Sequence, residues 1–397
     1  MKKILIIAAV LLCLLVLPRT ALADDDVEQA IEDEISDNIE RALDTADLHE
    51  IESFYNDYAS TLSPITGGTD IRSFLTMLAQ GGSELSFSNV LSMVTDALFA
   101  GVKSSIPVIV QIIVVALIFS VISHFKPSFG ASGVSKAAQT AQYVIIGTMT
   151  IGVLVSAFST GTQTIAAMTA FTADFFPLMF TLLTALGGMT SSAILSPATV
   201  FLTSGISVFY KSFVLPLIIV LTVFMIISHF STSVKLTGFC SLIKSIIKWG
   251  IGISFTVFLG IIAMQGLLGS TFDGLSIKTA KFTIDKFVPI IGGMFSDSVD
   301  VLLSCSLLIK NAVGVAGIII IVGIVITPIF AILAHYFLFK LAGAVLEPVA
   351  GSEMGKFAQE AADVLLLLFA AVTAAAIMFF VTTAVIIGTG NANVMLR

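Results

Sequence analysis

The chain has 397 residues, of which 57% are hydrophobic and 11% are charged, and its mean hydropathy is +1.05. Soluble domains carry about 25% charged residues, so this composition excludes an ordinary soluble protein and indicates that lipid is the main solvent. The net charge of −7 argues against nucleic acid as a partner, because binding to phosphates requires clustered positive charge.

The N-terminus has the three regions of a secretory signal peptide. Lys2 and Lys3 precede an apolar run over residues 4–17, and Ala21-Leu22-Ala23 supplies small residues for a cleavage site. We therefore expect residues 1–23 to be removed after export. An uncleaved anchor helix is the alternative, but the apolar run is shorter than the roughly 20 residues that a membrane span needs.

An acidic segment follows the signal peptide. Residues 24–60 hold 14 of the 26 acidic residues and one basic residue, Arg41. Apolar side chains recur at near-helical spacing from Val27 to Leu43, which predicts an acidic amphipathic helix. Its charged face is either a solvated surface or a docking surface for a partner protein. We expect the whole N-terminal region, residues 24–105, to lie on the outer side of the membrane.

Six later apolar runs are long enough to cross about 30 Å of hydrocarbon. They predict an all-α polytopic helical bundle over residues 106–397. Residues 175–210 are also apolar but contain Pro177, Gly187-Gly188 and Pro197, so they form either a re-entrant hairpin or two additional short spans. The six spans lie near residues 106–124, 140–158, 213–230, 249–269, 313–334 and 364–388.

Lysines between the spans set the expected orientation. The loop after the first span contains Lys126 and Lys136, and the loop between the third and fourth spans contains three lysines and no acid. Such loops stay in the cytoplasm. The loop over residues 271–311 balances four lysines against four aspartates and is expected outside. Cys240 and Cys305 then lie on opposite sides, so we expect no disulfide between them.

Similar tripeptides lie at the C-terminal ends of three of the predicted spans, at nearly constant spacing along the sequence. They are Ser123-His124-Phe125, Ser228-His229-Phe230 and Ala334-His335-Tyr336, with offsets of 105 and 106 residues between successive histidines. Lys235-Leu236-Thr237-Gly238 recurs 105 residues later as Lys340-Leu341-Ala342-Gly343, in the loop expected after the span. We predict parallel internal repeats of about 105 residues. Chance similarity among apolar segments is the alternative.

Ionisable residues close to the apolar segments are candidate functional groups. Asp174 lies beside the apolar stretch 175–210 and is a candidate pore-lining residue, because a charge in hydrocarbon is costly unless it faces protein or water. A gapped internal match between TAFTADFFP (169–177) and TAKFTIDKFVP (279–289) pairs it with Asp285, which Lys281 can reach one helical turn away. A simple position at the outer water interface is the alternative for Asp174.

The three histidines that close the spans raise the hypothesis of a metal site, but no Cys, Asp or Glu cluster completes a ligand set. We expect them to be interfacial positions, where an amphipathic ring lies between lipid and water: His124, His229 and His335. The sequence contains no P-loop, Gly-x-Ser-x-Gly, HExxH or CxxC motif. We therefore expect no enzymatic activity, and no metal or other cofactor.

One part of the chain is specific enough to suggest a family. It contains the segments FLGIIAMQG (258–266), DGLSIKTAKF (273–282), FVPIIGGMFSD (287–297) and LLIKNAVGVAG (307–317). These segments resemble the stage III sporulation protein AE family, and the likeness extends to the signal peptide, the acidic N-terminal region, the number of spans and the total length. The resemblance implies a multi-pass protein of the mother-cell membrane that surrounds the forespore in endospore-forming bacteria.

The resemblance also implies a function. Family members belong to a channel or secretion-like complex, often called a feeding tube, that joins mother cell and forespore. The implied partners are the other stage III sporulation A proteins, including a cytoplasmic ATPase, and stage II sporulation protein Q. A secondary transporter of a small solute, bound near Asp174, and a non-conducting membrane scaffold are the alternatives. The resemblance implies no catalytic residues.

Cysteine probes test the expected orientation. A cysteine at Ser276 is expected to react with an impermeant maleimide added outside, because it lies in the loop expected on that side. A cysteine at Ser241 is expected to react only when the reagent reaches the cytoplasm. The reverse pattern would refute the topology, and the cysteine-free parent protein is the control.

Overall fold

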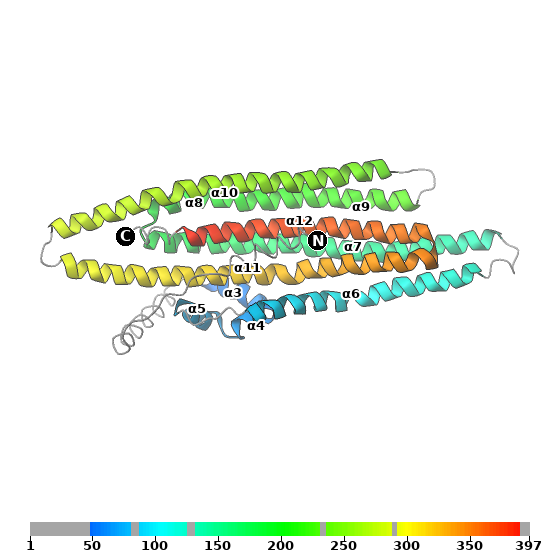
Figure 1. The fold of residues 1–397 in the computed structure, drawn as a ribbon, viewed down its shortest axis with the longest axis horizontal. Helices are drawn as coiled ribbons and strands as arrows, with labels where there is room; N and C mark the ends of the chain where they lie inside the picture. Colours follow the sequence, from blue (N-terminus) through cyan, green and yellow to red (C-terminus); the bar gives the residue numbers. More distant parts are fainter. Residues whose placement is uncertain (1–47, 81–86, 125–131, 231–235, 288–291, 390–397) are drawn as a thin grey trace.

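A computed structural model describes residues 48–80, 87–124, 132–230, 236–287 and 292–389. Within these ranges the secondary structure is helical, with no strand. Figure 1 shows that long helices form one elongated bundle and that short helices pack against one of its flanks. The predicted all-α fold class is confirmed. The predicted signal peptide and most of the acidic segment lie outside the described residues.

Six segments in the described ranges are long and apolar enough to cross a membrane. Each contains one of the predicted spans or most of it, because a backbone in lipid can satisfy its own polar groups only as a helix or a closed barrel. The helices concerned are α6 (Phe87–His124), α7 (Ser132–Ala185), α8 (Met189–Phe209) continued by α9 (Leu215–Phe230), α10 (Thr237–Phe287), α11 (Gly292–Ala350) and α12 (Ser352–Gly388).

A π-helical segment, Tyr210–Val214, joins α8 to α9. Pro216 follows it and has no N–H to donate, and a proline ring clashes with the carbonyl four residues earlier. Local widening of the helix relieves that clash. Pro177 and Pro197, by contrast, lie inside α7 and α8, which continue through them. The predicted breaks at these two prolines do not occur.

The apolar stretch 175–210 divides between two long helices instead of forming a hairpin of its own. Its first part extends α7, its second part forms α8, and the chain reverses between them at Gly187-Gly188. Gly187 has a left-handed backbone with φ of 84°. The N–H groups of the two glycines bond to the carbonyls three and five residues earlier, at 2.9 and 3.0 Å. This glycine cap ends α7 by satisfying its last carbonyls.

Three helical hairpins turn at the same end of the bundle. The connections of α6 with α7, α9 with α10 and α11 with α12 all lie at the right in Figure 1, and those of α7 with α8 and α10 with α11 lie at the left. This order fits the predicted repeat, which remains a prediction. Lys340-Leu341-Ala342-Gly343, however, lies inside α11 and not in a loop, because that helix continues to Ala350.

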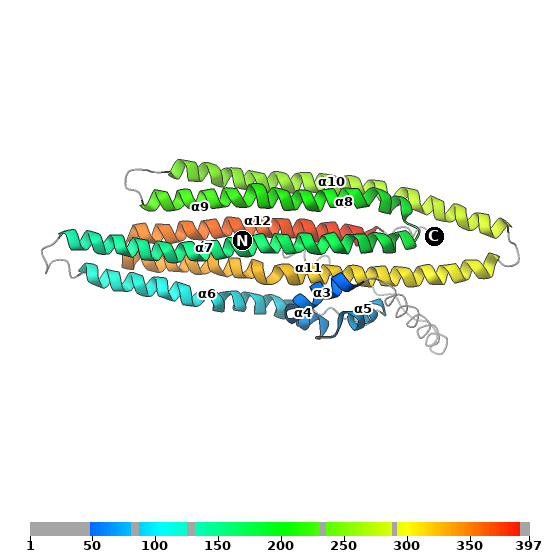
Figure 2. The ribbon, with the colours of Figure 1, turned by 180° about the vertical axis from the view of Figure 1, so that it is seen from behind.

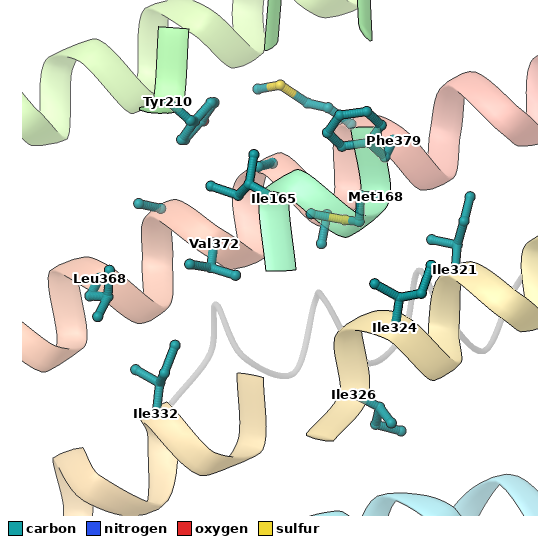
Figure 3. Close-up of a cluster of buried hydrophobic side chains, with 14 of the residues drawn as sticks. Ile165, Met168, Tyr210, Ile321, Ile324, Ile326, Ile332, Leu368, Val372 and Phe379 are labelled. Carbon is teal, nitrogen blue, oxygen red and sulfur yellow. The ribbon is translucent and has the colours of Figure 1, made fainter. Parts of the chain in front are cut away.

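The centre of the bundle is the antiparallel pair of α11 and α12, joined by α7. Side chains from these three helices meet in a buried apolar cluster, part of which is drawn in Figure 3. Glycines bring the two backbones close together. A Cβ added at Gly355 would lie 2.8 Å from Glu347, and one at Gly343 would lie 2.7 Å from Gln359. Small residues of this kind are typical of helix contacts within membranes.

Three short helices cover the flank formed by α6, α7 and α11. They are α3 (His49–Asp57), α4 (Ala59–Thr66) and α5 (Ile71–Ala79). Leu62 lies against Gly323 of α11, where an added Cβ would meet its side chain at 2.7 Å. The ring of Phe54 packs edge-on against Phe171 of α7, with ring centroids 5.3 Å apart. The short helices are therefore docked on the bundle by apolar contacts.

Gly317→Ala is expected to destabilise this bundle. A Cβ at position 317 would overlap the ring of Phe175, which is itself fully buried. Overpacking of this kind costs roughly 1–3 kcal/mol, so the unfolding temperature of the purified protein in detergent should fall by several degrees.

Gly252→Ala is the matched control, because nothing lies within 4 Å of its Cβ position. Alanine is favoured over glycine inside a helix by about 1 kcal/mol, so this variant should unfold at the same temperature or a higher one. An equal fall in both variants would contradict the close contact between α7 and α11.

Candidate functional site

Asp363 of α12 links three helices near the turn between α11 and α12. Its carboxylate accepts a hydrogen bond from Lys340 of α11 at 2.9 Å and lies 3.6 Å from Nζ of Lys244 of α10. The three side chains are 27–43% exposed, so each pair contributes no more than about 1 kcal/mol. We call these three residues the Asp363 cluster. It connects α10 to the central hairpin of α11 and α12.

His229 and His335 share one local arrangement. In each, Nδ1 donates to the carbonyl four residues earlier, at 3.0 Å to Met225 and 2.7 Å to Ala331. A carboxylate oxygen of Glu360 lies 3.9 Å from Nδ1 of His229. Among the described residues no group of three or more His, Cys, Asp or Glu side chains could hold a metal ion. The interfacial role of the histidines remains a prediction.

The remaining predicted site residues do not come together with these histidines. Asp174 is exposed on the surface of α7, and the next residue, Phe175, is buried against α11. Asp174 could therefore line a pore only if a neighbouring chain formed the opposite wall of that pore. Lys281 and Asp285 lie on α10 and His124 lies at the end of α6, at positions whose side chains are outside the described part of the chain.

Lys310 is completely buried, and sequence reasoning missed it. Its Nζ donates to the carbonyl of Ile387 at 2.6 Å, close to the C-terminal end of α12. The last carbonyls of a helix lack partners within the helix and form the negative end of its dipole. The ammonium group therefore satisfies one of these acceptors. The two residues are 77 positions apart, so no local pattern predicts the contact.

An apolar groove of about 710 Å³ lies between α8 and α10. Phe201 and Trp249 on its border are 73% and 69% exposed, whereas Met378 of α12 is buried behind it. The hydroxyl oxygens of Tyr210 and Ser254, which also line the groove, lie 3.1 Å apart. A lining of this composition suits a hydrocarbon chain better than a polar solute.

Aromatic side chains fill the centre of the bundle. Six phenylalanines from α7, α11 and α12 are at most 2% exposed: Phe171, Phe175, Phe176, Phe339, Phe357 and Phe379. Interiors packed to this degree leave few voids larger than a water molecule. In the described part of the chain, these side chains fill the space between α7, α11 and α12, and the polar contacts link one helix to another.

The sequence profile of the stage III sporulation protein AE family matches residues 69–390. The chain belongs to that family. Stage III sporulation protein AE of Bacillus subtilis (strain 168) is 27% identical over 358 residues, and the alignment covers 90% of each of the two chains. No solved structure matches the chain.

The match to the stage III sporulation protein AE family includes α5 and all six long segments, whereas α3 and α4 precede it. The resemblance predicted from the segments between residues 258 and 317 is thus confirmed. Together with the six candidate spans, family membership identifies a multi-pass membrane protein of sporulation.

Lys310→Met is expected to destabilise the packing of α11 against α12. Methionine keeps much of the side-chain volume but leaves the Ile387 carbonyl without its donor, and an unsatisfied buried acceptor costs about 1–3 kcal/mol. Thermal unfolding in detergent measures the loss. Lys211→Met, at a partly exposed position of the π-helical segment, is the control and should change little. A Lys310→Met protein as stable as the parent would contradict the assigned role.

Proposed function

We propose that this chain is the membrane subunit of a channel or secretion-like complex, the feeding tube, which joins mother cell and forespore and is required for spore development. Membership of the stage III sporulation protein AE family supports the proposal. The observation that carries it further is the close apolar packing inside the bundle, part of which Figure 3 shows. On this proposal the path through the complex lies between this chain and its neighbours, and the bundle forms part of the wall.

The proposal assigns a location and partners. The chain resides in the mother-cell membrane around the forespore, and it assembles with the other stage III sporulation A proteins and with stage II sporulation protein Q. It has no enzymatic activity of its own, so a cytoplasmic ATPase among these partners supplies the energy. The partly exposed charges near the α11–α12 turn suit a contact with such a cytoplasmic partner.

Purification of the tagged full-length chain from sporulating cells tests this proposal. After mild crosslinking, the other stage III sporulation A proteins and stage II sporulation protein Q are expected to copurify, as identified by mass spectrometry. The same tagged chain expressed in vegetative cells is the control. Recovery without these partners would contradict the proposal.

Reconstitution separates the complex subunit from a secondary transporter. The purified chain alone in liposomes is expected to show no gradient-driven solute uptake. Uptake that is specific for one solute and abolished by Asp174→Asn would instead establish a self-sufficient transporter. If the partners copurify and the assembled complex passes no solute or polypeptide, the chain is a scaffold and the channel role is wrong.

A further inference from the structure

Two helices on one flank of the bundle leave a groove between them. α8 and α10 lie together at this edge of the molecule in both views (Figures 1 and 2). The groove, of about 710 Å³, is lined by α8, the π-helical segment, α10 and one residue of α12. Its floor is buried, because Tyr210 and Met378 are at most 1% exposed. Its borders are open, since Phe201 and Trp249 are exposed, so the groove can be entered from the surface of the bundle.

Two glycines keep the groove open. An added Cβ at Gly205 of α8 would meet nothing within 4 Å, so this position of the lining faces open space. At Gly250 of α10 an added Cβ would make ordinary contacts with Phe213 and Phe209, at 3.6 and 3.7 Å. The space between the helices therefore follows from small residues at these two positions, and a larger side chain at position 205 would occupy it.

Every residue of the lining belongs to a candidate membrane span. The lining residues of α8, the π-helical segment and α10 lie in the spans Met189–His229 and Thr237–Met264, and Met378 lies in the span Ser352–Gly388. No residue of this lining is charged, and most are aliphatic or aromatic. Where these spans cross hydrocarbon, the molecules next to the groove are the acyl chains of lipids.

The hydroxyl groups in the middle of the groove already have partners within the protein. Ser254 donates to the carbonyl of Ile251 at 2.9 Å. A hydroxyl has one hydrogen, so Tyr210 is the donor of the bond that joins its hydroxyl to that of Ser254 at 3.1 Å. The groove therefore offers an occupant van der Waals contacts and few hydrogen bonds. A polar solute would lose its hydrogen bonds with water on entry, whereas an apolar chain would not.

The width of the groove decides between a single hydrocarbon chain and a helix. On α10 the lining runs from Ser245 to Ile261, a distance of about 24 Å at 1.5 Å per residue. A volume of about 710 Å³ over this length gives a mean cross-section of roughly 30 Å². An α-helix with its side chains is about 10–12 Å across, which corresponds to roughly 80–110 Å². A helix is therefore too wide to enter the groove, and an extended hydrocarbon chain is not.

We propose that this groove binds one acyl chain of a membrane lipid, which lies parallel to α8 and α10. The chain contacts Tyr210 on the floor and the rings of Phe201, Phe213 and Trp249 on the borders. Dispersion attraction is small for each pair of atoms but large over many contacts, and an empty groove would forfeit these contacts. A lipid held in this way stays with the protein when detergent replaces the surrounding lipid.

The two ends of the groove differ, and this difference gives the lipid a direction. The bonded hydroxyl pair marks the middle. Because α8 and α10 are antiparallel, Phe201 and Ile261 lie toward one end of the groove and Trp249 lies toward the other. The Asp363 cluster lies beyond Trp249, and tryptophan is typical of the level of the lipid headgroups. The headgroup of the bound lipid is therefore at the Trp249 end, and the terminal methyl group points toward Phe201.

Tryptophan fluorescence tests the lipid site directly. Trp249 is the single tryptophan of the chain, so its emission reports on the border of this groove alone. The full-length protein is purified in detergent, freed of lipid and titrated with phosphatidylglycerol that carries bromine, a contact quencher of tryptophan, on its acyl chains. Quenching is expected to saturate at equal amounts of lipid and protein. Bromine near the headgroup should quench more strongly than bromine near the terminal methyl group.

Two glycine variants locate the bound chain. Gly205→Leu fills the groove, so saturable quenching is expected to disappear and only the gradual quenching by lipid dissolved in the micelle should remain. Gly252→Leu is the matched control, because it adds the same side chain to α10 at a position outside the lining, where nothing lies within 4 Å. It should behave like the parent. Phospholipid extracted from each protein after purification from membranes should follow the same order, and thermal unfolding confirms that each variant is folded.

Three outcomes would overturn the proposal. Quenching of the parent that never saturates would show that the groove contacts only bulk lipid, and this result needs no substitution. Saturable quenching that survives Gly205→Leu would place the lipid elsewhere near Trp249. A parent dimer in gel filtration that Gly205→Leu converts into a monomer, without any retained lipid, would show that a second copy of the chain covers the groove.

Discussion

Close packing between α11 and α12 holds the remaining helices in place. Gly343 and Gly355 let the two backbones approach near the turn, and the Lys310 ammonium group binds the far end of α12. Because lipid provides little hydrophobic drive between helices, such contacts determine the arrangement within a membrane. α6 and α7 contact α11, and α7, α9 and α10 contact α12. The peripheral hairpins therefore depend on this central pair for their positions.

The sequence predicts the existence of the long helices well and their lengths poorly. Apolar runs show where lipid can surround a helix, and the six predicted spans follow from that. They do not show where a helix stops. α7 continues through Pro177, and α11 continues through Lys340 to Ala350, because neighbouring helices support backbone that would otherwise break or turn. At the described ends of the long helices, Gly187 and Gly351, with positive φ, mark places where local chemistry requires the helix to stop or start.

Charged residues were harder to place than apolar ones. Asp174 follows a long uncharged stretch, which favours a role inside the membrane, yet it is exposed on α7. Lys310 looks like one of several loop charges, yet it is fully buried. Which side of a helix a charge occupies depends on the packing of helices far apart in the sequence, and one sequence contains no signal for that packing. His229 and His335 bond to carbonyls within their own helices, and their interfacial role stays a prediction.

Helix length bears on how a subunit of this kind can reach partners outside the membrane. The candidate spans in α7 and α11 contain 46 and 47 residues, so each is about 70 Å long, more than twice the roughly 30 Å of hydrocarbon. Tilting of a helix in the bilayer can absorb only part of the difference, since tilts of membrane helices reach about 40°. The rest of these helices must lie in water beside the membrane. α3–α5 cover α7 and α11 there, and they give the projecting part of the bundle a polar surface that a partner can bind.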